Sequence, residues 1–306
     1  MYRCILAPVD GTAFGEHALP FAASLARRAA VELHLVHVHE PVTATGSMET
    51  LAYRGAWNEI VRDQEAGYLE GLAERLTRRH GIRVTTRIAE GSVAATLAAC
   101  ARECRAGLVV MSTHARTGLA RLLHHRVFEQ LSRDAGVPVL VVRPDHTEEE
   151  PELSGEPELS RVLIPLHGTT GAGSVLDHAL ELGRLFRARI TLLQVVQPEQ
   201  SLDGRASRDA AQLHHRLMRA QTAARQYLNA VAERLRAAGL EVEALVRFAP
   251  DTMTAIDGLL ATRSPHESFD MIVMEGQRHR PLTELFTGPP PERVAKHSHL
   301  PVMVVQ

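Results

Sequence analysis

Residues 3–11 read RCILAPVDG, and residues 160–168 read SRVLIPLHG. Each stretch is an apolar run that ends in a proline and a turn, which is typical of a strand buried on both faces of a parallel sheet. A second pair of similar stretches lies later in the chain, where AGVPVLVVRP at 135–144 matches SHLPVMVVQ at 298–306. The sequence therefore predicts two copies of one unit of about 145 residues.

Strands alternate with helices in each predicted copy. In the first copy, continuous apolar runs predict strands near 3–9, 32–39, 83–89, 107–112 and 137–143. Helices are predicted between them, near 15–30, 50–80, 92–105 and 121–134. The second copy repeats this order, with a long helix near 207–238. This alternation indicates an α/β protein with two tandem doubly wound parallel sheets.

The predicted helix 50–80 illustrates the local signals. Apolar residues recur along it at helical spacing, namely Ile60, Leu69, Leu72 and Leu76. Gly81 follows the helix and is expected to end it. Ser92 is placed to act as the N-cap of the next helix.

Charge separates the chain into three parts. Residues 144–160 hold seven acidic residues, three prolines and no lysine or arginine, so they are predicted to form a solvated, mostly extended linker. The flanking domains, 1–143 and 161–306, have net charges of +3 and +2. These small charges exclude a dedicated nucleic-acid binder.

Other counts narrow the class of protein. No apolar run reaches the roughly 18 residues that a membrane helix needs, so no membrane partner is expected. The three cysteines are too few for a disulfide framework, which favours a reduced cytoplasm. Lys296 is the only lysine, which excludes a phosphate loop of the GxxxxGK[ST] type.

The repeated strand signatures and the turns after the first and fourth strands resemble the universal stress protein family in its tandem form. The resemblance covers nearly the whole chain apart from the linker. It implies, in each copy, a Rossmann-like sheet of five parallel strands in the order 3-2-1-4-5. It also implies that the fifth strands, 137–143 and 300–305, pair the copies with pseudo-two-fold symmetry, and that two tandem chains form a homodimer.

The resemblance also implies a nucleotide site in the first copy. In the family's ATP-binding members, an aspartate after the first strand faces the adenosine, and a valine at the end of the second strand packs on the base. Asp10 and Val38 match these two positions. The expected residues for ATP or another adenine nucleotide are Pro8, Val9, Asp10, Val38, Met111, Thr113, His114, Ala115, Arg116, His125, Arg126 and Val127.

The family's phosphate-binding pattern after the fourth strand, G-x-x-G, nine residues, then G-[ST], is altered throughout. Its positions hold Ser112, Ala115, His125 and Arg126. Glycines there would let backbone N–H groups approach phosphate oxygens. Two interpretations stay open: the side chains of Arg116, His125 and Arg126 bind phosphate instead, or His125 and Arg126 form the first turn of a solvated helix.

The second copy departs further from the family pattern. Glu275 brings a negative charge to the place of a phosphate, and Pro289–Pro291, which follow Gly288, remove N–H donors or simply begin a helix. An ATP site of the family type is therefore not expected there. The matching pocket positions are His167, Val195, Glu275, Arg278 and Gly288.

The 17 histidines raise the question of a metal site. On the second predicted strand, His37 and His39 face one way and His34 the other, so the strand offers two ligands rather than three. Cys100 and Cys104 share a helix face and are interpreted as packing residues. Because no zinc-type signature is present, no native metal site is predicted.

These observations predict a cytoplasmic stress-response protein that binds a small molecule and regulatory protein partners. No catalytic residue and no required cofactor are predicted, so the protein is not expected to be an enzyme. Two alternatives remain open. One is a regulatory interaction module without a ligand, and the other is a slow ATPase, for which Asp10 and His114 are the available general bases.

Overall fold

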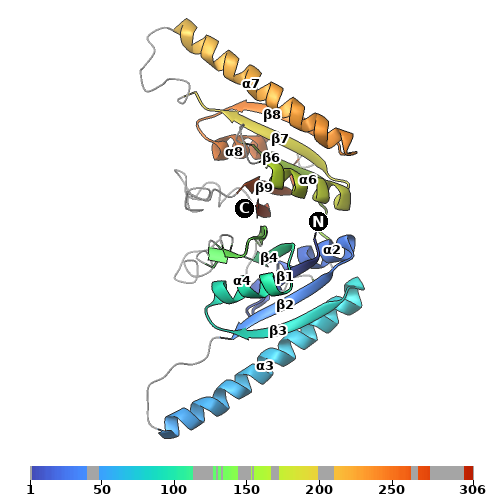
Figure 1. The fold of residues 1–306 in the computed structure, drawn as a ribbon, viewed down its shortest axis with the longest axis vertical. Coiled ribbons are helices and arrows are strands. Elements are labelled where there is room, and N and C mark those ends of the chain that lie inside the picture. The colour runs from blue at the N-terminus through green and yellow to red at the C-terminus, as the bar shows by residue number, and fades with distance from the viewer. Residues whose placement is uncertain are drawn as a thin grey trace. The chain divides into compact units, whose positions relative to one another are not determined.

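The computed structural model describes residues 2–39, 48–112, 127–128, 130–131, 134–143, 153, 155–166, 172–198, 210–262, 268–275 and 300–305. Side chains are not described at 48–56, 172 and 210–211. The chain divides into two compact units, Tyr2–Pro157 and Glu158–Val305. Both are drawn in Figure 1.

The first unit is a parallel sheet wrapped by helices. Its elements are β1 (Cys4–Pro8), α1 (Ala13–Glu16), α2 (Leu19–Ala29), β2 (Glu32–His39), α3 (Met48–His80), β3 (Val84–Glu90), α4 (Val93–Glu103), β4 (Leu108–Ser112) and β5 (Val139–Val142). The strand order is β3-β2-β1-β4-β5, with all neighbours parallel. Every residue of β4 and β5 is buried, as the apolar runs predicted.

The second unit repeats this architecture. Its elements are β6 (Arg161–Pro165), α6 (Ala172–Phe186), β7 (Arg189–Val196), α7 (Ala210–Ala237), β8 (Val242–Phe248), α8 (Thr252–Thr262), β9 (Met271–Glu275) and β10 (Val302–Val305). The strand order β8-β7-β6-β9-β10 is again parallel. The predicted pair of doubly wound α/β sheets is thereby confirmed. None of the described helices is long and apolar enough to cross a membrane.

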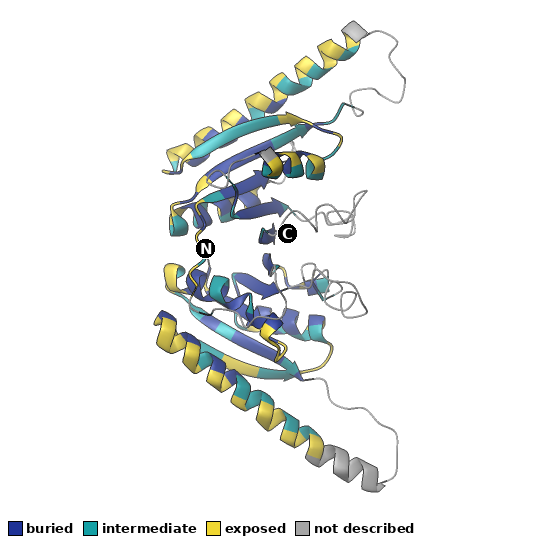
Figure 2. Cartoon of the chain, turned by 180° about the vertical axis from the view of Figure 1, so that it is seen from behind, coloured by how far each residue is buried: buried dark blue, intermediate teal, exposed yellow. Residues whose placement is uncertain are grey.

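The four apolar residues expected at helical spacing do not share one face of α3. Leu69, Leu72 and Leu76 are buried, whereas Ile60, nine residues before Leu69 and so about 180° around the helix, is 53% exposed. A helix of 33 residues is about 50 Å long, whereas the seven-residue strand β3 spans only about 23 Å. The sheet therefore covers only the C-terminal part of α3, and exposed residues mark much of its described length in Figure 2.

One predicted helix is divided in the structure, and the helix ends predicted at Gly81 and Ser92 agree with it. The single helix expected at 15–30 is divided into α1 and α2, because Pro20 lacks an N–H group and lies in the first turn of α2. Ser92 is the N-cap of α4, but its side chain makes no capping hydrogen bond. Gly81 ends α3 as predicted, with φ +65° and its N–H donating to Thr77 O at 2.9 Å.

The described part of the linker contacts the first unit. Glu156 forms ion pairs with Arg27 at 2.6 Å and Arg28 at 3.7 Å. His80 Nε2 donates to Leu153 O at 2.7 Å. Residues 155–160 form neither helix nor strand. Because these ion pairs are exposed, each is expected to contribute only about 0–1 kcal/mol.

Partly buried His178 on α6 predicts a pH dependence of stability. Burial lowers its pKa from 6.5 to about 4. The unfolded chain therefore binds a proton between these pH values that the folded chain excludes, so stability falls as the pH is lowered through this window. Urea unfolding at pH 7 and pH 4.5 is expected to show a smaller loss of stability for His178→Gln than for the wild type. Equal losses in both proteins would contradict the prediction.

Candidate functional site

The turn that follows β1 lies at the carboxyl edge of the first sheet. The buried Val9 continues the strand, its N–H donating to Val36 O at 3.0 Å and its carbonyl accepting from His37 Nδ1 at 3.0 Å. The chain then leaves the sheet at the exposed Asp10, and Gly11 turns it with φ +80°. The position of Asp10 is thus fixed by the strand before it and the turn after it.

The Asp10 carboxylate is held by its own loop. Oδ1 accepts from the Thr12 N–H at 3.0 Å and from Thr12 Oγ1 at 2.6 Å, while Thr12 Oγ1 accepts from the Gly15 N–H at 3.1 Å and caps α1. A Cβ on Gly15 would lie 2.3 Å from Asp10 Oδ1, so only glycine allows this approach. Within the described part of the chain, Oδ2 makes no hydrogen bond, and Asp10 is exposed.

Helix α1, which follows this loop, is held in place by contacts with β4 and α3. Ser112 at the end of β4 donates from Oγ to Gly15 O at 3.3 Å. The buried Glu16 accepts from Tyr68 Oη at 3.0 Å and from Arg75 Nη2 at 3.3 Å, both on α3. Burial, together with the negative charge of Glu16, raises the pKa of Tyr68, so the phenol stays protonated and donates.

The structure places five of the predicted nucleotide-binding residues along this carboxyl edge: Pro8, Val9, Asp10, Val38 and Met111. Val38 is half-buried one residue before the end of β2, and Met111 is buried opposite Val141 of β5. Val127 is half-buried in a short helical stretch. The remaining predicted residues lie outside the described part of the chain: Thr113, His114, Ala115, Arg116, His125 and Arg126.

A buried polar cluster below this edge was missed in the sequence. Glu65 of α3 lies between His37 and His39, with Oε1 3.2 Å from His37 Nε2 and Oε2 2.9 Å from His39 Nδ1. The predicted orientation of these histidines on one face of the strand is confirmed. Glu65 falls four residues before Leu69 on the apolar face of α3, and a carboxylate at such a position signals a buried polar partner. The cluster joins α3 to β2.

The corresponding edge of the second unit carries a different chemistry. Val195 is half-buried near the end of β7, and Glu275 is half-buried as the last residue of β9. Burial raises the pKa of Tyr227 on α7, and the charge of Glu275 adds to the shift. Glu275 therefore places a carboxylate where the family pattern has its first glycine. His167, Arg278 and Gly288 lie outside the described residues.

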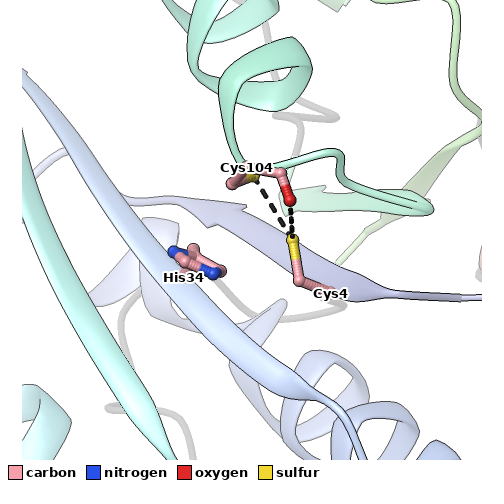
Figure 3. Close-up of side chains that lie close together, drawn as sticks. All are labelled: Cys4, His34 and Cys104. Atoms are coloured by element: carbon pink, nitrogen blue, oxygen red, sulfur yellow. Dashed lines mark hydrogen bonds between the residues drawn. The ribbon is translucent and has the colours of Figure 1, made fainter.

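The opposite, amino edge of the first sheet contains a group that the sequence did not suggest. Cys4 Sγ lies 3.3 Å from Cys104 Sγ, and one donor atom each from Cys4, His34 and Cys104 lie within 4.8 Å of one another. Figure 3 shows the three side chains converging from β1, β2 and the end of α4. Cys100 is buried in α4, as interpreted, but Cys104 is a member of this cluster rather than a packing residue alone.

An open depression of about 620 Å³ lies beside β3 and α4. Arg62 and Glu90 pair across it at 2.5 Å, and Ala89, which is in register with Val38, contributes to its wall. None of the predicted nucleotide-binding residues lines it. The carboxyl edge around Asp10 is therefore the stronger candidate for a ligand site.

Comparison with known proteins agrees with this geometry. The Universal stress protein family model matches residues 1–143 and again 158–306. Universal stress protein MJ0531 of Methanocaldococcus jannaschii is 27% identical over 146 residues, which cover 47% of this chain and 83% of that protein. Universal stress protein YxiE of Bacillus subtilis is 28% identical over 149 residues, covering 47% of this chain and all of that protein.

A solved structure shows the same tandem fold over the full length. The crystal structure of a universal stress protein from Archaeoglobus fulgidus superposes with a TM-score of 0.60 at 16% identity, and the match covers 99% of this chain and 96% of the other. At this identity the likeness concerns the fold alone. The two family matches, together with the two parallel sheets, show that the chain is a tandem member of the universal stress protein family.

Proposed function

We propose that the first unit binds an adenine nucleotide at the carboxyl edge of its sheet, and that the protein acts through this binding rather than through catalysis. The observation that carries the proposal is the exposed Asp10 carboxylate, which its loop fixes just after β1 through two hydrogen bonds to Oδ1. In doubly wound sheets, ligands bind beyond the carboxyl ends of the strands where the strand order reverses, here between β1 and β4.

The chemistry of the edge suits the nucleoside part of such a ligand. A carboxylate held by backbone and hydroxyl donors accepts a further hydrogen bond from a sugar hydroxyl without rearranging. Val38, half-buried at the same edge, offers an apolar surface for one face of a base. The resemblance to ATP-binding members assigns these same two roles to Asp10 and Val38.

The two units are proposed to differ in function. In the first unit, the basic residues that replace the glycine signature, Arg116, His125 and Arg126, supply positive charge for phosphate oxygens. In the second unit, Glu275 at the end of β9 repels phosphate, so this unit binds no nucleotide. Nucleotide occupancy of the first unit would then alter how the chain interacts with regulatory protein partners.

The proposal predicts a nucleotide-dependent gain in stability. Thermal unfolding with millimolar ATP, ADP or AMP is expected to show stabilisation of about 2.7 kcal/mol at a hundredfold excess over Kd. Asp10→Ala is expected to abolish this gain. Asp251→Ala is the matched control, because Asp251 likewise binds a backbone N–H and a hydroxyl of Thr254, at 2.8 and 2.9 Å, but belongs to the second unit.

Three outcomes would overturn parts of the proposal. If added nucleotide leaves the thermal unfolding midpoint of the wild type unchanged, the protein does not bind nucleotide, and a ligand-free interaction module is favoured. An equal gain in wild type and Asp10→Ala would move the site away from Asp10. Phosphate release from ATP that depends on Asp10 would replace the binding role with a slow ATPase activity.

A further inference from the structure

We propose that the first unit binds a Zn²⁺ ion at the amino edge of its sheet, with Cys4, His34 and Cys104 as ligands. Cys4 is the first residue of β1, His34 lies near the start of β2, and Cys104 is the C-cap of α4. Asp10 lies at the other end of β1, so this site is independent of the proposed nucleotide site. A metal ion there would join three elements that are distant in the sequence.

The fold itself brings the three side chains together. Cys4 is in register with Glu32, and Leu6 with His34, so Cys4 and His34 point to the same face of the sheet. Helix α4 lies against β2 and β3. The turn after α4 returns to β1, where the Gly107 N–H donates to Cys4 O at 2.9 Å. The end of α4, with Cys104, is thereby held over the start of β1.

The spacing of the sulfur atoms suits a tetrahedral zinc site. With Zn–S bonds of about 2.3 Å, two thiolates on one ion lie about 3.8 Å apart. Cys4 Sγ and Cys104 Sγ are 3.3 Å apart, so a movement of about 0.5 Å would admit the ion. The imidazole of His34 completes a set of two sulfur ligands and one nitrogen ligand, which is typical of zinc.

The surroundings of His34 prepare it as a ligand. Nδ1 lies 2.8 Å from Thr85 Oγ1, and a histidine that donates from Nδ1 presents the lone pair of Nε2. The remaining polar contact of Nε2 is with Glu32 Oε2 at 3.6 Å. Glu32, whose Oε1 pairs with Arg83 Nε at 3.2 Å, is not among the residues whose donor atoms lie within 4.8 Å of one another, so a water molecule would complete the tetrahedron.

The Cys4 thiol lies directly against the end of α4, with Sγ 3.2 Å from Cys104 O and 3.3 Å from Cys104 Sγ. Zinc binding would displace the protons of both thiols, because the thiolate is the form that binds a metal ion. Cys104 is half-buried, which gives an ion access, whereas Cys4 is buried.

A direct test is zinc binding to the full chain, stripped with a chelator and kept reduced with a phosphine. Wild type is expected to bind one Zn²⁺ tightly, and Co²⁺ in its place is expected to show sulfur-to-cobalt absorption. Cys104→Ser and His34→Gln should weaken Zn²⁺ binding by about a hundredfold or more, and Thr85→Val by about 10–100-fold. Cys100→Ser is the matched control, because this cysteine lies one turn earlier on α4 outside the cluster.

The control is expected to keep wild-type affinity and the cobalt spectrum. Circular dichroism would show that each variant remains folded, and half-buried Cys104 is the substitution least disruptive to the core. The proposal is overturned if reduced wild type binds no Zn²⁺, or if Cys104→Ser and His34→Gln bind it as tightly as Cys100→Ser does. Cobalt absorption without a sulfur contribution would likewise overturn it, because the ion would then lie on other histidines.

Discussion

Replacing Leu72 with alanine is expected to lower the free energy of unfolding of the first unit by about 2–5 kcal/mol. Leu72 is fully buried where α3 packs on the sheet. Alanine has a higher helix propensity than leucine, so the loss would report on packing and the resulting cavity rather than on the helix. Urea unfolding followed by circular dichroism measures the effect.

Ile60→Ala on the same helix is the matched control. Ile60 is 53% exposed, so this substitution is expected to change stability by less than about 0.5 kcal/mol. A large loss for Ile60→Ala would mean that the N-terminal part of α3 is covered by a partner, whereas a small loss for Leu72→Ala would contradict the packing of α3.

The contrast between Leu72 and Ile60 shows how far periodicity predicts structure. Leu72 lies three residues after Leu69 and four before Leu76, so these leucines share one face of α3, whereas Ile60 lies twelve residues before Leu72, about 120° around the helix. Periodicity alone does not determine how much of that face meets a sheet, because the cover depends on the length of strands elsewhere in the chain. Strands β4, β5 and β10 were predicted well, since each is a continuous apolar run that is buried throughout. Strands β3 and β8, in contrast, are half-buried or exposed along their length.

The candidate sites also differ in how much of them the sequence predicts. Asp10 follows β1 and Val38 lies near the end of β2, and the order of these strands implies a common carboxyl edge, so local patterns and a family resemblance were enough to predict their neighbourhood. The contact between Glu65 and His39 joins a helix to a strand 26 residues away. The place of Glu65 on the apolar face of α3 signals a buried polar partner, but no local pattern identifies that partner as a histidine of β2.

The sequence contains a signal that Cys4 and Cys104 lie close together. Cys4 begins β1, and Cys104 lies four residues before Leu108, which begins the neighbouring strand β4. In a parallel sheet the starts of adjacent strands lie at one edge, so both thiols are expected near that edge. The shared helix face of Cys100 and Cys104 drew the interpretation toward packing instead.

Gly107→Ala is expected to destabilise the first unit by about 1–3 kcal/mol, because the added methyl group would overpack a site that cannot relax. Its Cβ would lie 2.7 Å from Tyr2 Cα and 3.2 Å from Arg3 N, which are backbone atoms. Gly71→Ala is the matched control, and it is expected to change stability in the opposite direction. Gly71 is exposed within α3, a Cβ there meets nothing within 4 Å, and alanine should add about 0.5–1 kcal/mol of stability.

The same substitution connects stability to the proposed zinc site. Gly107 holds the turn after α4 against β1 through its hydrogen bond to Cys4 O, so a displaced turn would carry Cys104 away from Cys4. Zn²⁺ affinity is therefore expected to fall in Gly107→Ala, by about 10–100-fold as for loss of a positioning contact, and to stay at the wild-type value in Gly71→Ala. Unchanged stability in Gly107→Ala would show that the turn moves to accommodate the added methyl group. Lowered stability with unchanged Zn²⁺ affinity would show that this turn does not position the metal ligands.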